Sequence, residues 1–298
     1  PVAQQQFELV KRGPLPELKI GKSGNALEVV RAGGKLTVQN TLLTAVFNQS
    51  TGQLDELVLK GRQVIVPGQG FLYDNHRWIE NDTFRKTENG LEETGTCEVT
   101  EETAKTVTVR TSRDGSLCGT TLVYTFTSDG IMTLKAEFQP KTDELRRCGL
   151  VCGIEPSLNQ VDYYAYGPWE NYNDRKDGCM IGRYTTTVKD MSEKYVKPQS
   201  MGNREGLRNL RLTDTSGKGI EIETEGTVSF SLQPYTDEDL MLAKHTWELQ
   251  ERPYLVLHLD AALRGVGNAS CGSDVDTLPI YRVPQQPMSY TLRITAVE

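Results

Sequence analysis

The sequence predicts an all-β protein, built as one large antiparallel sandwich with few short helices. Apolar and polar residues alternate over most of the chain, which is the pattern of strands that bury one face. Turn signals such as SDG at 128–130 and TSGKG at 215–219 separate the alternating runs, so consecutive strands can pair as hairpins. A chain of 298 residues is long enough to bury a core of its own.

The predicted strands extend over most of the chain. The alternating runs are residues 35–40, 43–66, 103–112, 120–138, 161–166, 219–235, 253–263 and 289–297. One short helix is predicted after residue 236, because Thr236 is a good N-cap and acidic residues fill the first turn. Residues 1–20, with Pro14 and Pro16, are expected to be a linker, and residues 21–298 a single domain.

Composition and charge exclude several classes of protein. The net charge is −7 and no basic run exceeds three residues, so a nucleic-acid partner is not expected. No window approaches the roughly 18 apolar residues of a membrane-spanning helix. The first residues, PVAQQQFEL, contain no apolar signal core and begin with Pro1, and we expect a piece of a longer, soluble protein. The six cysteines have no metal-binding spacing, so no metal site is expected. No cofactor is expected in this chain either.

No catalytic residue stands out. A glycoside hydrolase needs two carboxylates that flank the scissile bond, but none of the acids lies in a distinguishing pattern, and each is better explained as a surface or turn-capping carboxylate. The acids considered are Glu170, Asp174, Glu205, Asp260, Asp274 and Asp276. His258 lies in the alternating run LVLHLDAAL and is expected to be a hydrogen-bonded residue on one strand face, and His245 is expected near the end of the helix. No GxSxG elbow is present.

Two loops combine residues that suit sugar contact. His76 and Trp78 lie in YDNHRWIEND, a mixture of polar and aromatic side chains. GVGNASCG, residues 265–272, lacks the GxGxxG spacing of a dinucleotide loop. This glycine-rich segment either brings backbone amides close to a ligand or is a tight connection between strands.

A third loop, YGPWENYNDRKDG at 166–178, combines aromatic, acidic, basic and turn-forming residues. Gly167 and Pro168 indicate a rigid turn after a strand. Trp169 and Tyr172 offer flat apolar faces, and Arg175 can bind a carboxylate through two hydrogen bonds. A carbohydrate site uses such residues, and so does a buried loop whose polar groups satisfy one another. Composition alone favours the structural role.

This loop and the segment YVKPQSMGNREGLRNLRLTD resemble the C-terminal domain of β-galactosidases of glycoside hydrolase family two. That family shows GxGPxENYxDR and then YxxPQENGxRxxxRxxxL. The matching residues are Gly167, Pro168, Glu170, Asn171, Tyr172, Asp174 and Arg175 in the first motif, and Tyr195, Pro198, Gln199, Gly202, Arg204 and Arg208 in the second. LRRCGL at 145–150 is similar to the family's PRxGL element, and the resemblance extends from about residue 21 to the end of the chain.

The resemblance implies a supersandwich fold similar to galactose mutarotase, attached to a catalytic (β/α)8 barrel and smaller β domains. It implies a parent enzyme that hydrolyses terminal β-galactosides with retention, with both catalytic glutamates and any Mg²⁺ or Na⁺ ligands on the barrel. This chain alone is then expected to be inactive. The implied partners are the other domains of the parent, the galactoside substrate and further copies of the parent. The compartment is open, with bacterial cytoplasm or periplasm as the implied choices.

Two positions depart from the family pattern. Where many relatives have GDDSWG with a tryptophan at the rim of the substrate site, this sequence has GNASCG, so Asn268, Ser270 and Cys271 become the candidate rim residues. Trp169 stands where relatives carry His or Gln, and it either offers an aromatic surface or packs internally. Two alternative functions stay open at this point, a stand-alone carbohydrate-binding module and an aldose epimerase-like protein.

Overall fold

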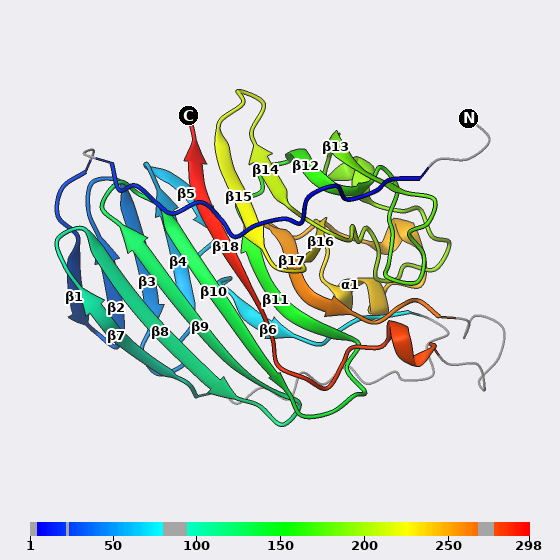
Figure 1. Cartoon of the computed structure of the whole chain (residues 1–298), viewed down its shortest axis with the longest axis horizontal. Coiled ribbons are helices and arrows are strands. Elements are labelled where there is room, and N and C mark those ends of the chain that lie inside the picture. The colour runs from blue at the N-terminus through cyan, green and yellow to red at the C-terminus, as the bar shows by residue number, and fades with distance from the viewer. Residues whose placement is uncertain (1–4, 22–23, 80–93, 268–276) are drawn as a thin grey trace.

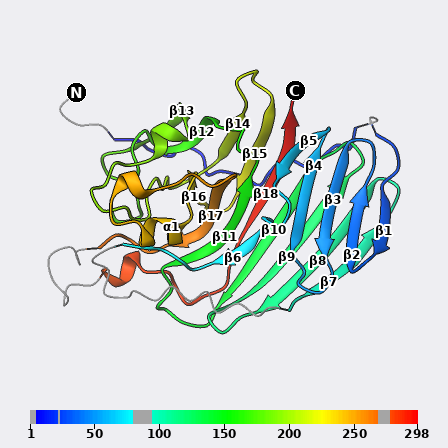
Figure 2. The ribbon, with the colours of Figure 1, turned by 180° about the vertical axis from the view of Figure 1, so that it is seen from behind.

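The computed structural model describes residues 5–21, 24–79, 94–267 and 277–298. Within these residues the chain forms two antiparallel sheets, each of nine strands, that lie against one another (Figure 1). The predicted large antiparallel all-β sandwich is therefore confirmed. The same two layers are seen from the opposite side in Figure 2.

The first sheet contains the early strands of the chain and three strands from its middle and end. Its order is β1 (Glu28–Ala32), β2 (Lys35–Gln39), β3 (Leu43–Asn48), β4 (Leu54–Leu59), β5 (Arg62–Ile65), β11 (Arg147–Ile154), β17 (Leu255–Leu263) and β16 (Ser229–Gln233), with β6 (Leu72–Asp74) paired to β11. This order brings β6 and β17 to the same central strand, although they are separated by more than 180 residues in the sequence.

The second sheet is built mainly from hairpins. Its order is β13 (Met180–Thr187), β12 (Gln160–Gly167), β14 (Asn209–Thr213), β15 (Gly219–Glu225), β18 (Met288–Val297), β10 (Met132–Pro140), β9 (Cys118–Thr127), β8 (Thr106–Asp114) and β7 (Thr96–Glu102). Because β12 pairs with both β13 and β14, the β12–β13 loop and the segment that precedes β14 lie at the same end of the sheet.

The core lies between the two sheets, as the alternating pattern predicts. Phe47 of β3 makes edge contacts with Tyr124 and Phe126 of β9, with ring centroids 5.1 and 6.0 Å apart. Near the other end of the sandwich, the ring of Tyr163 in β12 contacts that of Phe230 in β16 at 5.5 Å. Aromatic contacts of this kind between the sheets fix how one layer sits on the other.

The helix predicted after Thr236 is present as α1 (Asp237–Leu242), where the Thr236 hydroxyl and the Asp239 carboxylate form a reciprocal capping box. Lys197 Nζ donates to the carbonyls of Met241 and Ala243 at 2.9 and 2.5 Å, and so satisfies the other end of the helix. Three short 3₁₀ helices complete the helical part of the described chain, η1 (Lys189–Met191), η2 (Thr246–Glu248) and η4 (Pro279–Tyr281).

The N-terminal segment 5–21 has no regular secondary structure and crosses the outer face of the second sheet, from β13 to the turn between β9 and β10 (Figure 1). The side chain of Gln6 donates to Ile181 O at 2.8 Å and accepts from Ile181 N at 2.6 Å. Arg12 donates to the carbonyl of Leu207 at 3.3 Å. The assignment of residues 1–20 as a linker stays a prediction.

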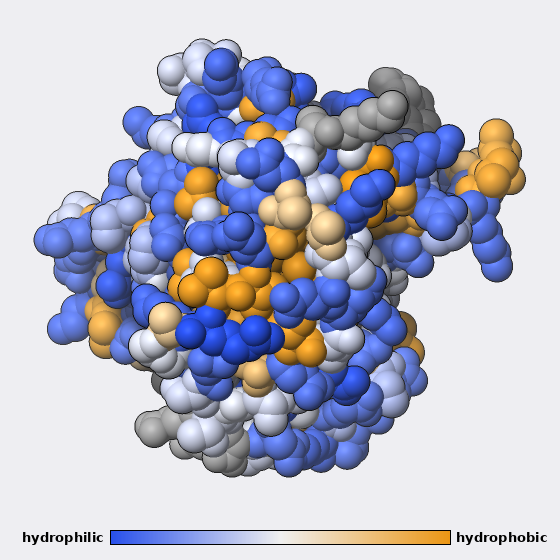
Figure 3. Space-filling view, turned by 90° about the vertical axis from the view of Figure 1, so that its left-hand side faces the viewer, coloured by the Kyte–Doolittle hydropathy of each residue, from blue (hydrophilic) through white to orange (hydrophobic). Residues whose placement is uncertain are grey.

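The end of the sandwich that carries β1 and β7 is incompletely closed. Figure 3 looks onto this end and shows apolar surface near its centre. The edge strands β1 and β7 contribute Val29, Cys97 and Val99, which pack against the core but are only partly buried. The polar motifs of the chain lie at the opposite end of the molecule, where α1 and the β12–β13 loop are found (Figures 1 and 2).

Candidate functional site

The two sequence motifs lie side by side because they flank paired strands. Residues 166–178 connect β12 to β13, and residues 195–208 lead into β14, which is the other neighbour of β12. Backbone hydrogen bonds join the two segments directly, from Tyr166 N to Glu205 O at 2.9 Å and from Asn171 N to Asn203 O at 2.8 Å. We refer to residues 166–178 as the motif loop.

Glu170 joins the two motifs through its carboxylate. It accepts a hydrogen bond from Gly202 N at 2.9 Å, and it also accepts from the Tyr195 hydroxyl. Arg175 forms an ion pair with the same carboxylate, whose side chain is only 7% exposed. These donors occupy the acceptor sites of Glu170, so its carboxylate joins the two motifs.

Asn171 is fully buried, and its side chain is satisfied by backbone groups on both sides. Its amide nitrogen donates to Tyr166 O at 3.2 Å and to Trp169 O at 2.9 Å. Its oxygen accepts from Glu205 N at 2.9 Å. A side chain with this number of partners fixes the conformation of the loop, because breaking any of them leaves a buried polar group unpaired.

The turn at Gly167 and Pro168 has no space for a larger residue. A Cβ atom at Gly167 would lie 2.6 Å from the Tyr163 hydroxyl and 2.8 Å from the Tyr184 ring. The Pro168 carbonyl accepts from Arg204 Nη2 and from the Tyr163 hydroxyl, each at 3.1 Å. Arg204 therefore connects the second motif to the turn of the first.

Asp174 extends the motif loop to the glycine-rich segment that follows β17. Its two carboxylate oxygens accept from Val266 N at 3.1 Å and from Gly267 N at 2.8 Å. A Cβ atom at Gly265 would lie 2.4 Å from the carboxyl carbon of Asp174, so only glycine permits this approach. The motif loop thus holds the backbone of residues 265–267 in place.

The aromatic residues of the motif loop differ sharply in exposure. Tyr172 is 3% exposed, and the Arg175 guanidinium carbon lies 5.3 Å from the centre of its ring. Trp169 is 70% exposed. Of the two possibilities left open by the sequence for Trp169, the structure has the exposed aromatic surface.

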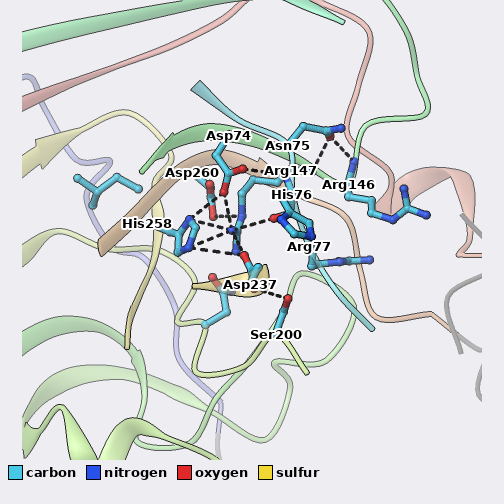
Figure 4. A network of polar contacts seen from close by, with 12 residues as sticks. Asp74, Asn75, His76, Arg77, Arg146, Arg147, Ser200, Asp237, His258 and Asp260 are labelled. Atoms are coloured by element: carbon cyan, nitrogen blue, oxygen red, sulfur yellow. Dashed lines mark hydrogen bonds and ion pairs between the residues drawn. The ribbon is translucent and has the colours of Figure 1, made fainter. Parts of the chain in front are cut away.

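A buried cluster of charged residues lies beside this end of the sandwich (Figure 4). We call Asp74, Arg147, Asp237, His258 and Asp260 the charge cluster; each is at most 8% exposed. Arg147 Nη1 lies 3.0 Å from Asp74 Oδ2 and 2.8 Å from Asp237 Oδ2. Arg147 Nε lies 3.1 Å from Asp260 Oδ2, and His258 Nδ1 lies 3.1 Å from Asp74 Oδ2. One guanidinium group therefore balances three carboxylates from β6, α1 and β17.

The carboxylates of the charge cluster differ in acidity. Burial alone would raise the pKa of Asp74, but the hydrogen bond with His258 and the charge of Arg147 outweigh burial and lower that pKa below its usual range. Burial raises the pKa of Asp260 to about 6, against the opposing effect of Arg147. Asp74 is therefore ionised at neutral pH, whereas Asp260 takes up a proton in mild acid.

The charge cluster fixes the segment that contains the two candidate sugar-contact residues. Asp74 Oδ1 accepts from His76 N at 2.8 Å, and Arg147 Nη1 donates to His76 O at 3.1 Å. Asp237 accepts from the Ser200 hydroxyl, which in turn accepts from Trp78 N at 2.7 Å. Ser200 N also donates to Trp78 O at 2.7 Å. Both residues are thus held through their backbone groups.

The site described above lies in a part of the chain that matches a known protein family. Residues 39–294 match the family described as beta galactosidase small chain. The chain belongs to this family. The motif loop, the charge cluster and the 265–267 segment all lie within the matched residues, so they are features of a β-galactosidase small-chain domain.

Whole β-galactosidases are the relatives of this small-chain domain. The β-galactosidase of Priestia megaterium is 25% identical over 279 residues, which are 89% of this chain and 27% of that protein. The β-galactosidase of Lactobacillus delbrueckii subsp. bulgaricus is 30% identical over 212 residues, which are 70% of this chain and 20% of that protein. The chain therefore spans less than a third of the length of these relatives.

Several solved structures align with this domain over most of its length. The galactose 1-epimerase of Lactobacillus acidophilus aligns over 94% of this domain and 99% of that chain, with a TM-score of 0.46 and 8% identity. A heparan sulfate lyase of Pedobacter heparinus aligns over 97% of this domain and 38% of that chain, with a TM-score of 0.44 and 9% identity. At this distance neither alignment bears on activity.

The small-chain domain offers one group of side chains with the composition of a metal site in the part of the chain that the structure describes. Asp74, Asp237 and His258 place ligand atoms within 4.8 Å of one another. Arg147 Nη1 already lies among these atoms as a cation, so the wild-type side chains leave no place for a metal ion there. No helix of the described chain is long and apolar enough to cross a membrane.

The residues singled out from the sequence differ in burial, and some of them lie outside the described part of the chain. His258 is a hydrogen-bonded residue on β17, as expected, while His245 lies in an exposed segment with its ring stacked on Trp247 at 4.2 Å. Glu205 is buried beside Asn203, and burial raises its pKa to about 7 against the opposing hydrogen bond from that amide. The remaining residues lie outside the described ones, namely Asn268, Ser270, Cys271, Asp274 and Asp276.

Sequence reasoning missed the charge cluster as a unit. Asp74, Asp237 and Ser200 were not singled out, and Arg147 appeared only within the LRRCGL element. The single available signal was His258 in the alternating run LVLHLDAAL, where a polar residue needs a buried partner.

Proposed function

We propose that this domain is the C-terminal part of a retaining β-galactosidase and that it braces and partly walls the galactoside site. In this proposal the two catalytic glutamates, and any Mg²⁺ or Na⁺ ligands, belong to a barrel domain outside this chain, and the parent assembles as a homo-oligomer. The domain supplies position and exclusion of water, and it moves no proton of the reaction.

The observation that best supports the proposal is the contact of Asp174 with the segment 265–267. The carboxylate of a residue in the motif loop binds two consecutive backbone amides immediately before the candidate rim residues. On the other side of these residues, Arg282 Nε donates to Thr277 O at 3.0 Å. In this proposal, the motif loop braces the backbone segment that leads into the candidate rim residues.

The described carboxylates also fit a role without catalysis. Glu170 is engaged by Gly202, Tyr195 and Arg175, and Asp174 by two amides. Asp260 lies in an ion pair inside the charge cluster. A retaining glycosidase needs two carboxyl groups about 5–5.5 Å apart on either side of the sugar. The family match to β-galactosidases, together with these occupied carboxylates, favours the bracing role over an epimerase or a free-standing sugar-binding module.

The proposal is tested in the complete β-galactosidase with Asp174→Asn. The amide oxygen still accepts from one backbone amide, but the amide nitrogen faces the other, so residues 265–267 shift. We expect kcat/KM on a chromogenic β-galactoside to fall by about 10- to 100-fold, because small displacements near a reacting centre have effects of this size.

Asp177→Asn is the matched control, since Asp177 is an exposed residue in the same loop. It should leave kcat/KM within about twofold of wild type, as expected for a surface substitution away from structural contacts. Unchanged kinetics in a correctly folded Asp174→Asn enzyme would remove the support for this role.

A further inference from the structure

The centre of the charge cluster has the surroundings of a metal ion, although a guanidinium nitrogen lies there. Arg147 Nη1 is 2.8 Å from Asp237 Oδ2 and 3.0 Å from Asp74 Oδ2. It is also 3.1 Å from the carbonyl oxygen of His76 and 2.7 Å from His258 Nδ1. Three oxygen acceptors and one imidazole nitrogen therefore surround a single nitrogen that carries only two hydrogens.

Two further observations indicate that this centre needs a positive charge. Neither carboxylate oxygen of Asp260 accepts a hydrogen bond, although the residue is 1% exposed and Oδ2 lies 3.1 Å from Arg147 Nε. The guanidinium group of Arg147 lies within 3.1 Å of carboxylate oxygens of Asp74, Asp237 and Asp260. Removal of the guanidinium would leave buried carboxylates without a counter-ion, which is strongly unfavourable.

We propose that Asp74, Asp237, His258 and the His76 carbonyl form a cation site that Arg147 fills from within the chain, and that this site accepts a divalent transition metal ion once the guanidinium is removed. This inference concerns a site apart from the proposed bracing role and does not depend on it.

The ligand set points to Zn²⁺ or Co²⁺ and not to Mg²⁺ or Ca²⁺. One imidazole nitrogen and two carboxylates are the ligands that Zn²⁺ and its neighbours prefer, whereas Mg²⁺ and Ca²⁺ prefer oxygen alone. Zn²⁺ binds such atoms at about 2.0–2.2 Å, so the ligands must close in by roughly 1 Å around the ion. Space for this movement is created by loss of the arginine side chain.

The test is Arg147→Ala in the complete 298-residue chain, purified in the presence of a chelator and then titrated with ZnCl₂ or CoCl₂. We expect one ion per chain by calorimetry, and d–d absorption in the visible region with Co²⁺. At a Zn²⁺ concentration of about 100 times Kd, the melting temperature should rise by about 5 °C or more. The wild-type chain should show none of these changes at the cluster.

Two matched variants separate specific binding from other effects. Arg147→Ala combined with His258→Ala should lose the stoichiometric site and the rise in melting temperature. Arg146→Ala removes the neighbouring buried arginine, which points away from the charge cluster in Figure 4, and should gain no Zn²⁺ site.

A folding defect in Arg147→Ala is itself informative. If the variant is unfolded in chelator, recovery of the native circular dichroism on addition of Zn²⁺ supports the site. Arg147→Gln, which keeps more of the side-chain volume, provides a second variant for the same titration. The proposal is overturned if neither variant binds or is rescued by Zn²⁺, or if binding persists without His258.

Discussion

The charge cluster and the motif loop both immobilise polar residues at the same end of the sandwich, but by opposite means. In the charge cluster, Arg147 balances carboxylates that water does not reach, so net charge decides its stability. In the motif loop, Asn171 connects backbone groups through neutral hydrogen bonds, and the adjacent Trp169 is exposed. The charge cluster therefore tolerates little change in charge, whereas the backbone around Asn171 tolerates little change in shape.

The largest difference is expected from Arg147→Met, which removes the positive charge and keeps much of the side-chain volume. Breaking a buried ion pair from one side typically costs about 3–5 kcal/mol. We expect a loss of that size in the free energy of unfolding, measured by urea denaturation at pH 7. A loss below about 1 kcal/mol would mean that the three carboxylates do not need Arg147, and the contrast between the regions would fail.

Asn171→Ala tests the hydrogen bonds inside the motif loop. The change leaves the Tyr166 and Trp169 carbonyls and the Glu205 amide without their partner. Unpaired buried groups cost about 1–3 kcal/mol each before relaxation, so a loss of about 2–4 kcal/mol is expected in the same denaturation experiment. Asn173→Ala, which removes one hydrogen bond to Tyr281 O, is the matched control with an expected loss of about 1 kcal/mol.

Glu205 is a buried acid beside the motif loop, and its effect on stability depends on pH. Burial raises its folded pKa to about 7, whereas the unfolded value is 4.5, so the folded state binds the proton more strongly. The contribution of Glu205 to stability is therefore lost as pH rises from about 4.5 to 7, by about 3 kcal/mol at most. Glu205→Gln should be more stable than wild type at pH 8 and nearly equal at pH 4.5, by thermal melts across this range. Equal stability of the two proteins at pH 8 would contradict the raised pKa.

The smallest effect is expected at the exposed edge of the motif loop. Trp169→Ala should change the free energy of unfolding by less than about 0.5 kcal/mol, because the side chain is 70% exposed. Tyr172→Ala, at 3% exposure in the same loop, should lose about 3 kcal/mol or more. Similar losses for both would show that Trp169 packs against the protein in solution.

The sequence predicts those strands that bury one face and expose the other. The pattern of β9, CGTTLVYTFT, alternates as its burial does, and the run 120–138 predicted both β9 and β10. β11 was missed because seven of its eight residues are buried, so no alternation marks it. β13 was missed for the opposite reason, since it is an edge strand without a buried residue.

The motif loop and the charge cluster also differ in how far the sequence could predict them. Glu170, Asn171 and Asp174 lie in one contiguous motif, and the family resemblance identified them together. Asp74, Arg147 and His258 are far apart in the chain and meet only because β6 and β17 both pair with β11. These contacts depend on the order of the strands in the sheet, which the alternation of apolar and polar residues does not encode.

We propose that this domain braces a galactoside site and cleaves no bond itself. The most direct test is an assay of the purified 298-residue chain on a chromogenic β-galactoside, with the complete β-galactosidase as the positive control. We predict turnover indistinguishable from buffer for the isolated chain. Turnover that co-purifies with the chain through successive columns and disappears on mutation of one of its own carboxylates would contradict the claim.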